Sequence, residues 1–277
     1  MSQRSPQLLE ITPRKGWASL GLGEVWEFRG LLYHLTAREI KGRYRQMALG
    51  PLWIILKPFM AMVVFSIVFG TMAKLPSDGM PYPLFSYAAL LPWQLFSVSV
   101  SKSSASLITN MAVISKVYFP RLLVPLAASG GGLVDFFMSF GILLGMMFWY
   151  GFYPGWNMLL LPAYILLALA TALALGLWLA TLAVKFRDVS FGVDHALQIL
   201  MYLTPVVYPS SMVQQPWCDY YMLNPMAVVI DGFRWSLLGK GQPPTLSSLG
   251  VAACVVLVLL TGAFILRRFE RSIVDIQ

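Results

Sequence analysis

The hydrophobic pattern of the chain is dominated by long apolar stretches. A helix needs about 20 mostly apolar residues to cross a bilayer, and five stretches meet this requirement. They run from about Leu52 to Ala73, Leu84 to Ile108, Leu122 to Trp149, Met158 to Val184 and Leu246 to Leu266. A weaker sixth stretch, Phe191 to Tyr208, contains Asp194, His195 and Pro205. With the sixth included, the pattern predicts an all-α polytopic membrane protein with six transmembrane helices and both termini on one side.

Trp26 to Arg45 is predicted to form a helix that lies on the membrane surface. One face of this helix is basic and another is apolar. The basic stripe consists of His34, Arg38, Lys41 and Arg45, and the apolar patch of Phe28, Leu31, Leu32 and Leu35. This pattern is typical of an amphipathic helix in the cytoplasmic membrane interface. Such a helix either only anchors the chain to lipid or also docks a partner.

The segment from Trp217 to Leu238, just before the last predicted span, is too apolar for a solvated loop. Its Asn224-Pro225 dipeptide divides it into two short halves, because proline interrupts a helix. We therefore expect an external re-entrant helix pair. Irregular backbone at that depth is tolerated only beside protein or a water-filled cavity.

Composition and charge support the membrane assignment. Of 277 residues, 58% are hydrophobic and 12% are charged, whereas about 25% of the residues of a soluble domain are charged. The net charge is +8. Fifteen lysines and arginines fall in the terminal regions and in the loops after spans two and four, against Lys74, Arg234 and Lys240 opposite. The positive-inside rule then makes both termini cytoplasmic, and the excess charge reflects topology and anionic lipid rather than nucleic-acid binding.

Polar residues within the predicted spans are the candidates for a functional path. In the second span, Gln94, Ser97, Ser101 and Ser104 fall at i, i+3, i+7 and i+10 and therefore share one helix face. Such a face either packs on another helix or lines a wet path. In the third span, Asp135 costs about 2.5–3.5 kcal/mol in hydrocarbon. It therefore needs a partner or a cavity.

The sequence offers no sign of catalysis by this chain. It has no GxxxxGK[ST] phosphate loop, no HExxH and no CxxC pair, and these are common signatures of nucleotide and metal sites. The two cysteines, Cys218 and Cys254, form no disulfide framework. We therefore expect no catalytic residue, no metal site and no cofactor bound by this chain, so energy for transport would come from a partner.

Four segments, taken together in order and spacing, resemble one protein family over about residue 26 to the end. They are Arg38–Tyr44 with Leu49–Trp53 and Pro58; Asn110–Arg121 with Pro125; Lys185–Asp188 with Thr204–Pro209; and Asn224-Pro225 with Gly232–Arg234. The chain resembles the membrane permease subunits of ABC transporters that export bacterial cell-surface polysaccharides, such as O-antigen, capsule and teichoic acid.

The resemblance implies a homodimeric permease in the bacterial inner membrane, joined to two copies of a cytoplasmic ABC ATPase subunit that binds ATP and Mg. The dimer interface would enclose a channel for lipid-linked polysaccharide. The whole chain, 1–277, would be one transmembrane permease domain, with a cytoplasmic N-terminal region at 1–50 and a channel-forming region at 51–277.

The resemblance also suggests roles for individual positions. The ATPase-coupling residues would be Asn110, Ile114, Lys116, Tyr118, Phe119, Arg121, Lys185, Arg187 and Asp188. The substrate would enter beside the N-terminal interface helix, at Arg38, Lys41, Arg43 and Tyr44. The candidate channel or gate residues are Gln94, Ser97, Ser101, Ser104, Asp135, Tyr208, Asn224 and Arg234. Arg234 would either meet a phosphate or sugar or pair with Asp231 at i, i+3.

Other functions remain open at this point. A drug or small-lipid exporter of the same superfamily would have a closed lateral pocket instead of an uninterrupted aromatic-lined bore. A membrane-embedded lipid-glycan enzyme would need clustered charges on one membrane face, where only Asp219, Asp231 and Arg234 are available outside. A structural assembly scaffold would have no ATPase partner.

Overall fold

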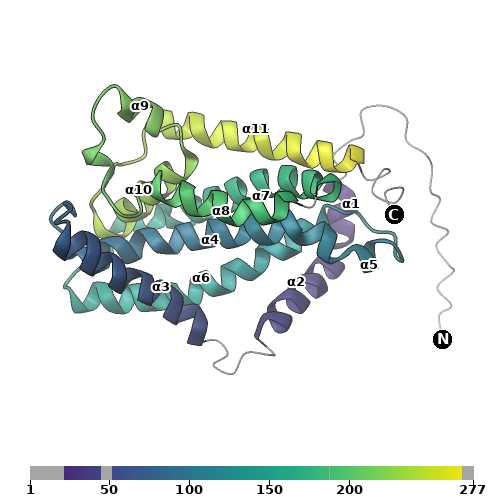
Figure 1. Cartoon of the computed structure of the whole chain (residues 1–277), viewed down its shortest axis with the longest axis horizontal. Helices are drawn as coiled ribbons and strands as arrows, with labels where there is room; N and C mark the ends of the chain where they lie inside the picture. Colours follow the sequence, from purple (N-terminus) through teal and green to yellow (C-terminus); the bar gives the residue numbers. More distant parts are fainter. Residues whose placement is uncertain (1–21, 45–51, 187, 270–277) are drawn as a thin grey trace.

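The computed structural model describes residues 22–44, 52–186 and 188–269, and these ranges are helical with no strand. Long helices run along the longest axis of the molecule (Figure 1). Five are long and apolar enough to cross a membrane: α3 with its π-helical continuation η1 (Leu52–Phe65, Ser66–Met72), α4 (Tyr82–Thr109), α6 (Leu123–Trp149), η2 with α7 (Trp156–Leu160, Leu161–Lys185) and α11 (Leu246–Phe269). The five strong predicted spans are therefore confirmed as helices, and the chain is a multi-pass membrane protein.

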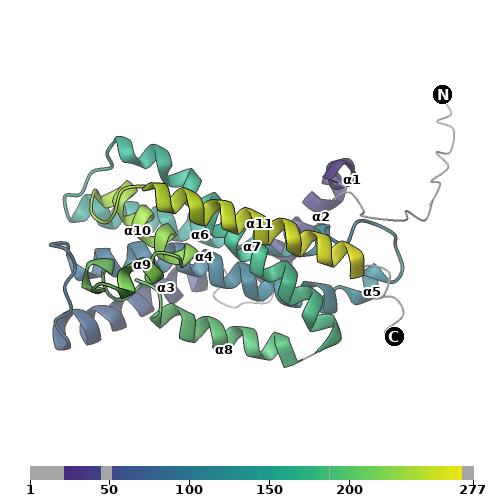
Figure 2. The same ribbon diagram turned by 90° about the horizontal axis from the view of Figure 1, so that it is seen from above.

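The shorter helices lie at the two ends of the bundle and along one edge. They are α1 (Leu22–Glu27), α2 (Arg29–Tyr44), α5 (Met111–Ile114), α8 (Asp188–Tyr202), η3 (Ser210–Met212), α9 (Trp217–Tyr221) and α10 (Pro225–Leu238). Figure 2 shows α8 running along the edge of the bundle. In Figure 1, α1, α2 and α5 lie at one end and α9 and α10 at the other.

The predicted sixth span is not confirmed as a membrane-crossing helix. The 15 residues of α8 rise about 22 Å at 1.5 Å per residue, which is less than the roughly 30 Å of a hydrocarbon core. The helix ends before Thr204-Pro205, because the residue before a proline disfavours the α conformation. Turns continue the chain from there.

The centre of the fold is α4, which packs against α3, α6, α7, α8 and α10. Every residue from Leu84 to Trp93 is buried. Small residues allow the neighbouring helices to approach closely, as in other membrane bundles. A Cβ atom added at Gly176 of α7 would lie 2.5 Å from Oγ and 2.6 Å from Cβ of Ser103. The contact between α4 and α7 therefore requires glycine at this position.

A second, smaller apolar cluster closes the end that carries α2 and α5. Leu35 of α2 joins Leu107, Phe119 and Leu266 there. Two polar contacts reinforce it: Arg267 of α11 pairs with Glu24 of α1 at 2.8 Å, and the Arg38 guanidinium donates a hydrogen bond to Oδ1 of Asn110. The N-terminal helices are thus attached to the ends of α4, α6 and α11.

Substituting Gly176→Ala is expected to destabilise the protein, because the added methyl group meets Ser103. Overpacking of this kind costs about 1–3 kcal/mol. The measurement is the apparent Tm of the purified protein in detergent. Gly250→Ala on α11 is the matched control, since nothing lies within 4 Å of a Cβ atom there. An equal Tm for the two variants would contradict the close contact.

Candidate functional site

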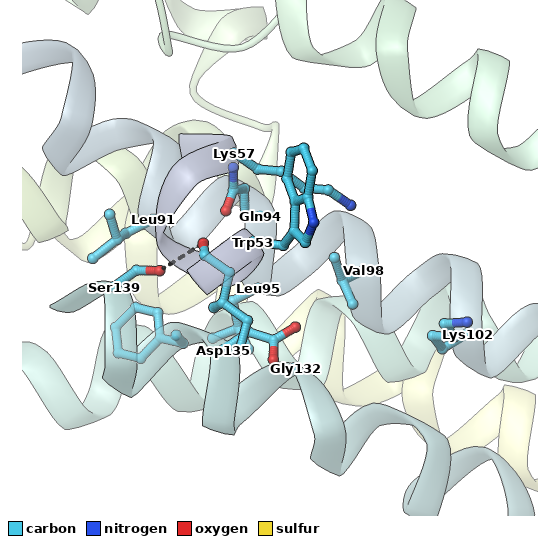
Figure 3. Close-up of a pocket in the computed structure, with 12 residues that line it drawn as sticks. Trp53, Lys57, Leu91, Gln94, Leu95, Val98, Lys102, Gly132, Asp135 and Ser139 are labelled. Carbon is cyan, nitrogen blue, oxygen red and sulfur yellow. Dashed lines mark hydrogen bonds between the residues drawn. The ribbon is translucent and has the colours of Figure 1, made fainter. Parts of the chain in front are cut away.

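Two adjacent cavities lie along one side of α4, beside its residues 91–102. The first, of about 360 Å³, lies between α3, α4 and α6. Its polar lining residues are Lys57, Gln94, Lys102, Asp135 and Ser139. Figure 3 shows Lys57 and Gln94 grouped at one end and Lys102 at the other.

The second cavity, of about 410 Å³, lies between α4 and α8. Its polar lining residues are Ser97, Ser101, Lys102, Asp194 and Gln198. Val98 and Lys102 line both cavities. The two cavities therefore meet along α4 and form one groove with a mainly apolar lining that includes these polar side chains, which we call the α4 groove.

The four residues of the polar face predicted on α4 are divided between the two cavities and the protein interior. Gln94 lines the first cavity, Ser97 and Ser101 line the second, and Ser104 is buried. The hydroxyl groups of Ser97 and Ser104 donate to the carbonyls of Gln94 and Ser101, at 3.3 and 2.8 Å. Both alternatives for the face thus occur, because Ser104 packs inside the protein while the other three border a cavity.

Asp135 is half-buried and lines the first cavity. It lies near the middle of α6, one helical turn before Ser139 on the same face. Asp135 was predicted to need a partner or a cavity, and the structure places it at a cavity.

A proline in α3 explains why Ser139 is at this position. Pro58 has no N–H group, so the carbonyl of Ile54, four residues earlier, loses its helical donor. The Ser139 hydroxyl donates to that carbonyl at 3.4 Å (Figure 3). In hydrocarbon a neighbouring helix must satisfy such a freed backbone group. This bond fastens α3 to α6 beside the cavity.

Arg234 lies at the opposite end from α2 and is 2% exposed. Its guanidinium lies 3.5 Å from the centroid of the Phe85 ring, Nη2 donates to the carbonyl of Val206 at 3.1 Å and Nε to the carbonyl of Phe85 at 3.4 Å. Nη1 is 3.9 Å from Oδ1 of Asp231. Of the two roles considered for Arg234, the structure supports pairing with Asp231, because almost no surface is left for a substrate.

Burial opposes the charge of both partners in this pair. It lowers the pKa of Arg234 to about 10 and raises the pKa of Asp231, while each partner partly offsets the effect on the other. The pair joins α10 to α4 and to the segment after α8. Breaking a buried pair on one side leaves an uncompensated charge, so this end depends on both residues.

The other residues near Arg234 also have packing roles. A Cβ atom at Gly232 would lie 2.0 Å from the Tyr164 ring. The Phe233 ring packs edge-on against Phe136 and Phe140, at centroid distances of 5.9 and 6.4 Å. The Gly-Phe-Arg sequence therefore fits α10 against α7, α6 and α4.

Asn224 and Tyr208 hold the α9–α10 segment in place. Asn224 caps α10 by accepting a hydrogen bond from the Met226 backbone N–H at 3.0 Å, and its Nδ2 donates to Oγ1 of Thr204 at 3.3 Å. The Tyr221 hydroxyl donates to that of Tyr208 at 3.3 Å. The predicted helix boundary at Asn224-Pro225 is confirmed. Sequence reasoning missed Thr204 as a partner of Asn224, since no local pattern links residues 20 positions apart.

At the α2 end, the Asn110–Arg121 segment combines buried and exposed residues. Asn110, Ile114 and Phe119 are buried, and Asn110 accepts from Arg38 while donating to the Ser106 carbonyl at 2.9 Å. Lys116, Val117 and Tyr118 are exposed, the latter two at 57% and 66%. We call these three residues the exposed tip.

The remaining predicted positions at this end lie near the surface. Lys41, Lys185 and Asp188 are exposed and Arg121 is half-buried. The Lys185 ammonium lies 5.3 Å from the centroid of the Phe186 ring. The side chains of Arg43 and Tyr44 and all of Arg187 lie outside the described part of the chain. The candidate residues thus form three separate groups: the α2 end, the α4 groove and the Arg234 end.

Within the described ranges, no group of three or more His, Cys, Asp or Glu residues comes together in a way that could hold a metal ion.

Comparison with known proteins gives one consistent result. The profile of the ABC-2 type transporter family matches residues 30–238, from α2 to the end of α10. The chain is 33% identical to the O-antigen export system permease protein RfbA of Myxococcus xanthus, over 87% of this chain and 92% of that protein. It is 27% identical to RfbA of Klebsiella pneumoniae, over 74% and 78%. It is 21% identical to the polysialic acid transport protein KpsM of Escherichia coli, over 86% and 93%.

Substituting Ser139→Ala is expected to destabilise the protein by about 1 kcal/mol, because the Ile54 carbonyl loses its donor. The same substitution should cost less in a Pro58→Ala background, where residue 58 regains an N–H for that carbonyl. The measurement is a double-mutant cycle on thermal or denaturant unfolding in detergent. Strictly additive effects of the two substitutions would contradict the link.

Proposed function

Because the chain belongs to the ABC-2 type transporter membrane family, we propose that it is the transmembrane subunit of an ABC exporter for lipid-linked, O-antigen-like polysaccharide. The observation that carries this proposal is the near full-length similarity to permeases named for O-antigen and polysialic acid export. Three relatives covering 74–87% of the chain bear such names. The function therefore concerns the whole described bundle and not one motif.

The proposed location is the bacterial inner membrane, with both termini cytoplasmic. The distribution of basic residues supports this orientation, and the α1, α2 and α5 end of the bundle is then the cytoplasmic end. At this cytoplasmic end, α2 would lie in the interface between the membrane and the cytoplasm. We propose that α8 and the turns after it, up to Tyr208, together make the sixth crossing. The α9–α10 segment would be the re-entrant pair on the external side.

A homodimer would explain the surroundings of the α4 groove. The helices beside the groove expose large apolar side chains, such as Met60 and Val64 on α3 and Phe191 and Ile199 on α8. A groove lined by lysine and carboxylate side chains is costly against lipid. A second copy packed through α3 and α8 would turn two facing grooves into one polar channel, through which the glycan would pass.

Energy would come from two copies of a cytoplasmic ABC ATPase that bind ATP and Mg. The exposed tip is suited to contact such a partner, since buried Ile114 and Phe119 hold it against the bundle while Val117 and Tyr118 face outward. Lys185 and Asp188 would form a second contact. Closure of the ATPases on ATP would push on the tip and shift the bundle between closed and open forms.

The substrate would enter from the cytoplasmic leaflet beside α2. Arg38 is already bonded to Asn110, which couples α2 to the start of the ATPase contact. Exposed Lys41 is then the described basic residue of α2 best placed to attract the phosphate groups of a lipid carrier.

Replacing Val117 and Tyr118 by Asp should disrupt the complex, because tyrosine is enriched among the few interface residues that each contribute more than about 1 kcal/mol and a buried unpaired carboxylate is costly. We expect at least a tenfold loss in co-purification of the co-expressed ATPase and a matching loss of glycan export. Tyr153→Asp is the control, since Tyr153 is an exposed aromatic residue, 73% exposed, in the loop after α6 at the other end. Unchanged binding and export in the double variant would contradict the proposed function.

A further inference from the structure

Two lysines on the wall of the α4 groove have no role in the packing described above. Lys57 of α3 and Lys102 of α4 both line the first cavity, and Lys102 also lines the second. Both side chains are exposed. Neither Lys57 nor Lys102 forms a hydrogen bond or an ion pair with another residue that the structure describes.

Both lysines belong to helices long and apolar enough to span the membrane. A charged residue within such a segment is costly against lipid, and it faces a partner, a water-filled cavity or the membrane surface. Among the described residues that line the first cavity, Asp135 is the single acid. The lining of the first cavity therefore carries one more positive than negative charge, which favours an anion there, whereas Asp194 balances Lys102 in the second cavity.

The two lysines lie at different levels along the groove. Lys57 lies at the Gln94 end of the cavity and Lys102 at the other end (Figure 3). Gln94, Val98 and Lys102 are spaced four residues apart on α4, so the two levels differ by about 12 Å. Lys102 is the nearer of the two to the end of α4 at Thr109, where α2 and α5 lie.

We propose that Lys102 and then Lys57 bind the phosphate groups that join a lipid carrier to its glycan, as two successive contacts along the groove. This inference rests on the proposed function. An ammonium group on a flexible stem binds phosphate as a point charge, which suits a phosphate that must move on after binding. The side-chain amide of Gln94 adds a neutral hydrogen-bond donor at the level of Lys57.

The test uses the full chain, co-purified with its ATPase in nanodiscs, and three lipid probes. The probes are a long-chain polyprenyl diphosphate, the matching uncharged polyprenol, and phosphatidylglycerol. We expect the wild type to bind the diphosphate at least tenfold more tightly than the polyprenol. The K57Q/K102Q double variant should lose at least tenfold in diphosphate affinity, equivalent to 1.4 kcal/mol, and a K57R/K102R variant should retain most of it. K240Q, at an exposed lysine after α10, should bind like the wild type.

Three results would overturn the proposal. The first is diphosphate binding by K57Q/K102Q that equals that of the wild type. The second is phosphatidylglycerol binding of equal strength and equal lysine dependence, which would assign the lysines to membrane lipid. The third is dissociation of the assembled complex by the substitutions, which would assign the lysines to subunit packing. Failure of the wild-type chain to bind any ATPase would instead refute the proposed function.

Discussion

The absence of water in a bilayer core is the constraint on which the structure depends. Every polar group at that depth must find a partner in the protein or border a cavity. The chain meets this demand around α4, whose N-terminal half is buried without interruption from Leu84 to Trp93. Its middle carries Gln94, Ser97 and Ser101 into the α4 groove. Between α6 and α3, the Ser139 hydroxyl donates to the Ile54 carbonyl that Pro58 leaves without a helical donor, so this polar group also has a partner in the protein.

The two ends of the bundle are held together by different interactions. At the α10 end, buried Arg234 links α10 to the carbonyls of Phe85 and Val206. At the α2 end, Arg38 bonds to Asn110 and Arg267 pairs with Glu24. Between these ends, α8 buries only the narrow stripe of Val193 and Leu197. A movement of α8 relative to a fixed α4 would therefore break few contacts, as expected for a helix that borders the proposed channel.

Hydrophobic pattern alone predicted the elements that depend on local sequence. The five long helices follow from unbroken apolar runs, and the α10 boundary follows from Asn224-Pro225. The length of α8 was overestimated, because apolar residues continue past Thr204-Pro205 although the helix does not. The burial of Arg234 depends on Phe85, 149 residues away, and the Ser139 bond spans 85 residues. The spacing of residues within one helix does not reveal contacts between residues so far apart in the chain. The sequence therefore left both roles of Arg234 open and suggested no role for Ser139.

We propose that Gln94, Ser97 and Ser101 on α4 border water and not lipid. Cysteines introduced at Ser97 and Ser101, after replacement of Cys218 and Cys254, test it with a charged, membrane-impermeant thiol reagent in the assembled complex during ATP hydrolysis. Only a thiol in contact with water ionises and reacts. We expect labelling at both positions and none at Leu257→Cys, because Leu257 on α11 is 62% exposed on a predicted membrane span and should face lipid. Ser97→Cys and Ser101→Cys as unreactive as Leu257→Cys would contradict it.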